Sequence, residues 1–260
     1  MNGGALSRAV RGDSTMKFLR GLLLAATLIF VSVPASATNK NHQKAQAATF
    51  VLYGRSVSRG IDHKELCTAF AYKKAPDGYY LLTAGHCFIG TNAPVDVTYV
   101  VAQGQIVSDP KNLQPVEVLN AVDDGKMDVA ELHLKTDNKY SILKLDENPT
   151  KIDDEVFYVG YPEMVVQAVY MGRVSSEIIS KSCDEGEGDL CTGRFLVQTG
   201  GGPGASGSPI INEHTGRVVG ILEGHVFENG VVVVLAIDDY YSKVGHNQIK
   251  NASSESEVVQ

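Results

Sequence analysis

A histidine, an aspartate and a serine stand in three short segments whose residue types suit nucleophilic catalysis. In the first segment, residues 81–87, an apolar run ends in small residues and then presents His86. Histidine is the natural general base near neutral pH because its reference pKa is about 6.5. If this segment stood alone, an ordinary histidine on a loop would be the better interpretation.

The second segment begins with Asp128, which opens an alternating run over residues 128–134. A carboxylate between apolar neighbours is expected to be partly buried and to need a hydrogen-bond donor. An imidazole N–H would serve, and it would fix the tautomer that leaves the other ring nitrogen free as a base. The alternative is a turn aspartate, a role that Asp123 and Asp124 fit better because they precede Gly125.

The third segment is a glycine-rich loop, residues 200–209, with Ser206 near its centre. Glycine permits backbone conformations that are closed to other residues. Such a loop can turn the N–H groups of Gly204 and Ser206 towards one point, where two convergent donors would stabilise an oxyanion. A flexible connector or a phosphate-binding loop are the alternatives, but the Gly-Lys-Ser/Thr ending of the latter is absent.

Together the three segments resemble the trypsin/chymotrypsin superfamily. Residues 83–87 match its histidine motif, residues 128–132 its Asp-(Ile/Val)-Ala-x-Leu pattern, and residues 204–209 its Gly-x-Ser-Gly-(Gly/Ser)-Pro loop. The order His, Asp, Ser along the chain is that of chymotrypsin-type enzymes. The resemblance covers roughly residues 49–244 and implies a two-barrel serine endopeptidase with no metal and no organic cofactor.

The resemblance also implies roles for the matching residues. Ser206 would attack the scissile carbonyl, and His86 would take its proton and later donate it to the leaving amine. Asp128 would orient His86, and the N–H groups of Gly204 and Ser206 would form the oxyanion hole.

Two departures from the family pattern concern activation and specificity. Ala205 stands where digestive enzymes carry the aspartate of their zymogen switch, so we expect that switch to be absent. The Gly-Ser-Pro ending is closer to bacterial glutamyl endopeptidases, but Leu222 stands where their specificity histidine would align, which argues against glutamate specificity. We expect the primary specificity pocket to be lined by Thr199, Gly200, Glu223, Gly224 and His225.

The elements that must position these residues are strands. Short runs rich in Val, Ile, Tyr and Phe, bounded by Gly, Pro, Asn and Asp, predict an all-β fold. The resemblance and two sets of about six runs indicate two six-stranded antiparallel β-barrels, over residues 48–134 and 152–246, joined by a polar connection at 135–151. A short helix is expected near 238–244, and a disordered tail at 247–260. The expected strands cover residues 50–53, 68–72, 79–83, 95–101, 115–119, 129–134, 155–159, 165–170, 194–199, 208–211, 217–222 and 231–236.

Residues 1–37 are interpreted as a leader that contains a signal peptide from about Met16. A basic segment, an apolar run at 22–33 and an Ala-x-Ala site at 35–37 follow in that order. A membrane anchor or a buried helix is the alternative. We therefore expect a secreted or periplasmic protein with no membrane attachment after cleavage. The formal net charge of −7 disfavours nucleic acid as a partner, and we expect a monomer that acts on polypeptides.

Four cysteines in an exported chain suggest two disulfides, with three possible connectivities. Sequence proximity favours Cys67–Cys87 and Cys183–Cys191. Zinc is the competing interpretation, but no Cys-x-x-Cys pair or paired histidine spacing is present. The acidic loop 183–191 could bind calcium, although a solvated loop closed by a disulfide fits its spacing better.

Three other functions are alternatives to a peptidase. An α/β-hydrolase esterase would need Gly at the position of Ser208 and a histidine at the end of the triad order. A regulated protease with interaction domains is not expected, because few residues follow Val244. A catalytically inactive binding protein with the protease fold stays open, because fold alone does not establish activity.

Overall fold

The structure is a computed structural model that describes residues 39–58, 61–88, 97–104, 113–123, 127–164, 166–179, 193–226 and 230–240. The predicted signal peptide, the loop with Cys183 and Cys191, and the predicted tail 247–260 lie outside the described residues. Within the described residues, no helix is long and apolar enough to cross a membrane.

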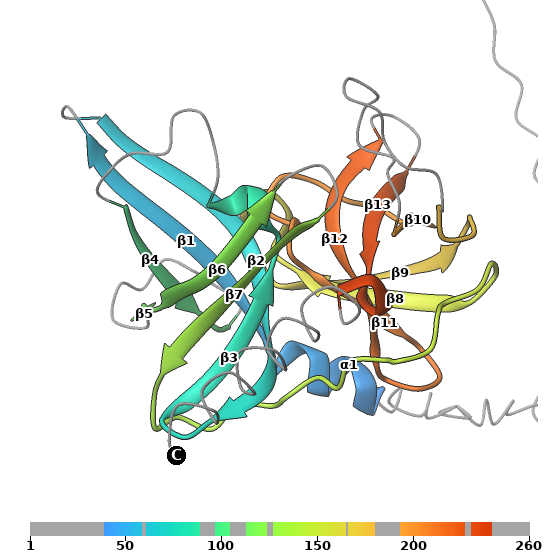
Figure 1. The fold of residues 1–260 in the computed structure, drawn as a ribbon, viewed down its shortest axis with the longest axis horizontal. Coiled ribbons are helices and arrows are strands. Elements are labelled where there is room, and N and C mark those ends of the chain that lie inside the picture. The colour runs from blue at the N-terminus through green and yellow to red at the C-terminus, as the bar shows by residue number, and fades with distance from the viewer. Residues whose placement is uncertain are drawn as a thin grey trace, which may run out of the picture. The chain divides into compact units, whose positions relative to one another are not determined.

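The first half of the chain forms one curled antiparallel sheet with the order β5-β4-β1-β2-β3-β7-β6 (Figure 1). Only Val116 separates β5 from β6, and its N–H donates to the Tyr99 carbonyl at 3.1 Å. The first and last strands of the sheet are therefore consecutive in the chain, which is how the sheet curls round. Its strands are β1 (Thr49–Ser58), β2 (Ile61–Ala75), β3 (Gly78–Thr83), β4 (Val97–Ala102), β5 (Gln114–Pro115), β6 (Glu117–Asp123) and β7 (Asp128–Lys135).

The second half forms a closed antiparallel barrel with the order β10-β13-β12-β11-β8-β9. The predicted all-β, chymotrypsin-type architecture is confirmed. A short helix, α2 (Ile237–Tyr240), follows directly after β13. The strands of this barrel are β8 (Glu155–Gly160), β9 (Ala168–Val174), β10 (Arg194–Gln198), β11 (Pro209–Asn212), β12 (Val218–Val226) and β13 (Val231–Ala236).

Apolar clusters fill each half and the space between them. Successive side chains of a strand point to opposite faces, and here neighbours enter different clusters. Leu81 of β3 packs inside the first sheet, whereas Leu82 joins a cluster that also contains Phe157 and Ile221 of the second barrel. Strands that bury both faces read as apolar runs rather than as strict alternation. The shared cluster fixes the first sheet against the second barrel.

Two local features differ from the sequence prediction. The hairpin of β1 and β2 runs in continuous register from Thr49↔Phe70 to Ser58↔Ile61, so both strands are longer than predicted. In place of a strand from residue 165, the short 3-10 turn η3 (Pro162–Met164) follows β8, and β9 begins at Ala168.

The helix α1 (Lys40–Gln46) has no counterpart in the predicted elements. Its seven residues are too few for a stable isolated helix. The helix is instead held by the second barrel: the His42 Nε2 atom lies 3.0 Å from the Glu213 carboxylate, and Ala45 enters the shared apolar cluster. Because this support comes from tertiary contacts, no periodic pattern in the sequence predicts the helix.

Candidate active site

The first part of the site is a histidine held by a buried aspartate. His86 lies on the 3-10 turn η1 (Gly85–Cys87), three residues after β3 ends, and Asp128 is the first residue of β7. The pairing of β3 with β7 brings the two segments together. The His86 Nδ1 atom lies 2.6 Å from Asp128 Oδ2, and the His86 backbone N–H donates to Oδ1 at 2.7 Å. One carboxylate therefore orients both the ring and its backbone.

The surroundings of His86 make it a stronger base than a free imidazole. Burial lowers its pKa, but the hydrogen bond and the charge of Asp128 raise the pKa by more. The charges of Asp123 and Glu223 raise it further. The net result is a raised pKa of His86. With Nδ1 bonded to the carboxylate, Nε2 is the nitrogen left to accept a proton.

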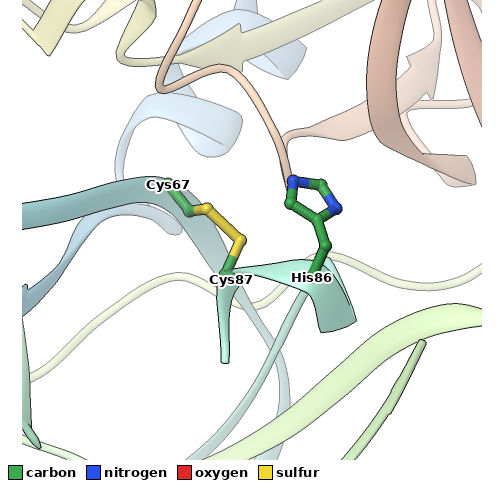
Figure 2. Close-up of side chains that lie close together, drawn as sticks. All are labelled: Cys67, His86 and Cys87. Atoms are coloured by element: carbon green, nitrogen blue, oxygen red, sulfur yellow. A yellow bond between two sulfur atoms is a disulfide. The ribbon is translucent and has the colours of Figure 1, made fainter. Parts of the chain in front are cut away.

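A disulfide fixes the turn that carries the histidine. Cys87 is bonded to Cys67 of β2, as predicted, and their Cα atoms are 6.4 Å apart. Figure 2 shows that His86 and Cys87 project from the same short turn, with Cys67 on the neighbouring strand. A nitrogen of His86 and the two sulfur atoms lie within 4.8 Å of one another. Both sulfurs are used in the S–S bond, so this group offers no thiolate to a metal.

The serine loop consists of two consecutive tight turns. The Ala205 N–H donates to the Gly202 carbonyl, and the Ser208 N–H donates to the Ala205 carbonyl, each at 3.0 Å. The third positions of these turns have φ of 91° and 83° and are occupied by Gly204 and Gly207. Type II turns require such a positive φ at that position, which explains the glycines. Ser206 is the second residue of the second turn.

The two predicted oxyanion-hole donors, the N–H groups of Gly204 and Ser206, form no hydrogen bond within the part of the chain that the structure describes. Neither the Gly204 N–H nor the Ser206 N–H has a hydrogen-bond acceptor among these residues. The carbonyl groups of the same two residues, in contrast, are both hydrogen-bonded to Thr68. This arrangement leaves the two N–H groups free to bind an anion.

The Ser206 hydroxyl is not bonded to His86 in this structure. Its Oγ atom donates to the backbone carbonyl of Glu223 on β12 at 3.1 Å. The same stretch of β12 is bonded to the two residues that follow Ser206, because the Gly207 N–H donates to the Leu222 carbonyl and the Leu222 N–H donates to the Ser208 carbonyl. Attack by Ser206 would require its hydroxyl to rotate from Glu223 towards the imidazole.

Glu223 also takes part in a buried ion pair. Its carboxylate accepts from Arg194 Nε at 2.8 Å and from Nη2 at 3.0 Å, and the two side chains are 9% and 4% exposed. Burial raises the pKa of Glu223 to about 7, while the charge of Arg194 opposes this shift. The ion pair was not predicted from the sequence. The only signal for it is a single arginine at the start of an apolar strand, since a buried charge needs a partner.

Comparison with known proteins agrees with this geometry. Residues 67–221 match the family described as the trypsin-like peptidase domain. The chain belongs to the trypsin-like peptidase family. The resemblance seen in the three motifs is thereby confirmed, and the protein is a serine-type peptidase. No curated protein sequence is significantly similar to this peptidase.

Solved structures of proteases resemble the peptidase in fold. The active form of the Rv3671c protease from M. tuberculosis has a TM-score of 0.62 at 19% identity, covering 82% of this chain and 86% of its own. The serine endoprotease from Yersinia pestis has a TM-score of 0.58 at 19% identity, covering 82% and 67%. Deg5 has a TM-score of 0.60 at 15% identity, covering 79% and 91%. At these identities the likeness shows the fold alone.

Two of the side chains predicted to line the specificity pocket of the peptidase, those of Glu223 and Thr199, have partners within the protein. The segment that follows β10 lies close to β12 and β13. A methyl group added at Gly201 would lie 3.8 Å from His225 Cβ and 3.0 Å from Val232 Cγ1. The Glu223 carboxylate, in contrast, is occupied by Arg194. The Thr199 hydroxyl donates to the Met171 carbonyl at 2.9 Å.

The backbone of Gly200 is also engaged, because its carbonyl accepts from the Tyr158 hydroxyl at 2.9 Å. Gly224 and His225 follow Glu223 on β12, and their contact with substrate stays a prediction.

Proposed function

We propose that this peptidase is an extracytoplasmic serine endopeptidase that hydrolyses polypeptides through an acyl-enzyme at Ser206. The observation that carries the proposal is the Asp128–His86 pair beside the serine loop. Asp128 uses both oxygens to hold His86, which leaves Nε2 as the base. This orientation of the imidazole supports the proposal, because a carboxylate on Nδ1 fixes the tautomer in which Nε2 can accept a proton.

In the proposed reaction, the Ser206 hydroxyl turns from the Glu223 carbonyl to His86 Nε2. Nε2 takes the hydroxyl proton as Oγ bonds to the scissile carbonyl carbon, and the carbonyl oxygen becomes an oxyanion held by the N–H groups of Gly204 and Ser206. The intermediate collapses as the C–N bond breaks, and the imidazolium protonates the departing amine. A water molecule then attacks the acyl-enzyme ester while His86 takes its proton. The second tetrahedral intermediate collapses, the imidazolium returns the proton to Ser206 Oγ, and the carboxylic acid product leaves.

The remaining parts of the proposal rest on sequence and on the disulfide. The leader pattern and the Cys67–Cys87 bond favour an oxidising compartment outside the cytoplasm. Cleavage within a chain, and action as a monomer, stay predictions.

A catalytically inactive binding protein is the second candidate. The hydrogen bond from Ser206 to Glu223 favours it, because the hydroxyl is directed away from the base. A latent serine of this kind would not react with an electrophile that needs an activated nucleophile.

A fluorophosphonate probe distinguishes the two candidates. We expect the purified protein to be labelled and Ser206→Ala not to be labelled. Ser208→Ala is the matched control, since the Ser208 hydroxyl is buried in the same loop without a hydrogen-bond partner in the described structure. Its removal should leave labelling intact. His86→Ala should reduce turnover by a factor on the order of 10⁶. A folded wild-type protein that takes up no probe would refute the proposed activity.

A further inference from the structure

Thr68 connects the two halves of the site through four hydrogen bonds. It lies on β2 and is fully buried. Its N–H donates to the Ser206 carbonyl at 2.7 Å, and its Oγ1 hydroxyl donates to the Gly204 carbonyl at 2.8 Å. The same hydroxyl oxygen accepts the Tyr161 N–H at 3.1 Å, and the Thr68 carbonyl accepts from Thr83 Oγ1 at 2.7 Å. Every polar group of Thr68 is thus in use.

The two carbonyl groups that Thr68 binds belong to the peptide groups before and after the one that carries the Ser206 N–H. The Gly204 carbonyl belongs to the peptide group before Ala205, and the Ser206 carbonyl belongs to the peptide group before Gly207. Peptide groups are planar, so fixing a carbonyl fixes the plane of its whole group. The peptide group between Ala205 and Ser206, which carries the Ser206 N–H, is therefore held from both ends.

Gly204 needs such an anchor more than other residues do. Its φ of 91° is available only because it lacks a side chain, and the same freedom lets its backbone rotate easily. The Thr68 hydroxyl binds the carbonyl of this residue, and so fixes the peptide group between Gly204 and Ala205. The peptide group that carries the Gly204 N–H is fixed separately, because its Pro203 carbonyl accepts the Glu163 N–H at 2.7 Å. A displacement of a catalytic group by about 1 Å can reduce the rate about 100-fold.

Thr68 also belongs to the segment that holds the histidine. Its neighbour Cys67 forms the disulfide to Cys87, next to His86. Thr83, the last residue of β3, donates to Thr68 from the other side. The serine loop is part of the second barrel and Thr68 is part of the first sheet, so this residue sets one half of the site against the other.

We propose that Thr68 is a positioning residue that directs the Ser206 N–H group towards the oxyanion. The inference rests on the proposed function, because it assigns a role in that reaction. Thr68 touches no reacting atom. It acts by stabilising the transition state through the loop and leaves substrate binding unchanged.

Thr68→Val removes the hydroxyl and keeps the size and the backbone groups. We expect kcat for a peptide amide substrate to fall about 10- to 100-fold, with KM changed less than about threefold. The affinity for a peptide boronic acid, which forms a tetrahedral adduct, should fall by the same factor as kcat. Thr68→Ser keeps the hydroxyl and should restore kcat to within a few fold.

Thr49→Val is the matched control. Thr49 is equally buried, lies on the adjacent strand β1, and its hydroxyl donates to the Ala45 carbonyl at 2.8 Å, far along the chain from the triad. It should lower Tm as Thr68→Val does and leave kcat unchanged. Should Thr68→Val fail to fold by far-UV circular dichroism, Thr68→Ala removes the same hydroxyl without risk of overpacking and takes its place.

The inference is overturned if both valine variants lose kcat equally, if only KM rises, or if Thr68→Ser does not restore activity. Fluorophosphonate labelling separates this result from failure of the proposed function. A labelled wild type with unchanged kinetics in Thr68→Val would refute the role of Thr68 alone. A folded wild type without labelling would refute the proposed function, and the role of Thr68 with it.

Discussion

Replacing Gly207 by alanine should destabilise the protein strongly, because two independent effects act at this position. The backbone there has φ of 83°, a conformation that L residues rarely adopt. An added Cβ would also lie 2.1 Å from the Thr68 carbonyl oxygen and 2.2 Å from Thr83 Oγ1. The first of these is a backbone atom, which cannot move aside as a flexible side chain would.

The expected size of the effect follows from these two terms. A positive φ disfavours an L residue by about 1–2 kcal/mol, and overpacking in a well-packed interior adds about 1–3 kcal/mol. The lower entropy of unfolded alanine offsets about 0.4–1 kcal/mol. The free energy of unfolding of Gly207→Ala should therefore fall by about 3 kcal/mol.

Two other glycines separate the two terms. Gly104 has φ of 117°, and no atom of the described residues lies within 4 Å of an added Cβ, so Gly104→Ala measures the backbone term alone. Gly224 has no positive φ and, among the described residues, no atom near an added Cβ, so Gly224→Ala should change stability by no more than about 0.5 kcal/mol. We expect Gly104→Ala to cost about 1 kcal/mol.

Urea unfolding in a Ser206→Ala background, where self-cleavage is absent, provides the measurement. The chain has no tryptophan, so far-UV circular dichroism is the suitable signal. If Gly207→Ala were no less stable than Gly104→Ala, the contact with Thr68 would not constrain this position, and the reasoning would be wrong.

Two further predictions concern charges around the site. Asp123→Asn should extend activity to lower pH. The charge of Asp123 helps to raise the pKa of His86, so removing that charge lowers the pKa. His86 must be neutral to act as a base, and it would then stay neutral at lower pH. The acid limb of kcat/KM against pH tests this, with the exposed Asp137→Asn as a control that should leave the limb in place. Glu223→Leu should lower the free energy of unfolding by about 3–5 kcal/mol, because it leaves the Arg194 guanidinium buried without its carboxylate. Arg194→Met combined with Glu223→Leu should recover most of that loss in urea unfolding, and a double variant as unstable as the single one would argue against the ion pair.

Local patterns in the sequence were enough to predict the fold class and to select the candidate site residues. Strand periodicity and turn residues are local properties, so each predicted strand has a counterpart in the structure wherever the chain is described. The three motifs are local as well, and they placed His86, Asp128 and Ser206 on their segments. The pairing of Cys67 with Cys87 followed from their proximity in the chain.

The contacts of these segments across the two halves of the protein could not be predicted from local patterns. The bond from Thr68 to Gly204 joins residues that are 136 positions apart. The ion pair of Arg194 with Glu223 depends on which face of β12 turns inward. A strand pattern cannot settle such a choice, because a shift of one residue exchanges the two faces. Hydrogen bonds between distant segments depend on the way the strands curl and pack, and that packing is a property of the whole chain.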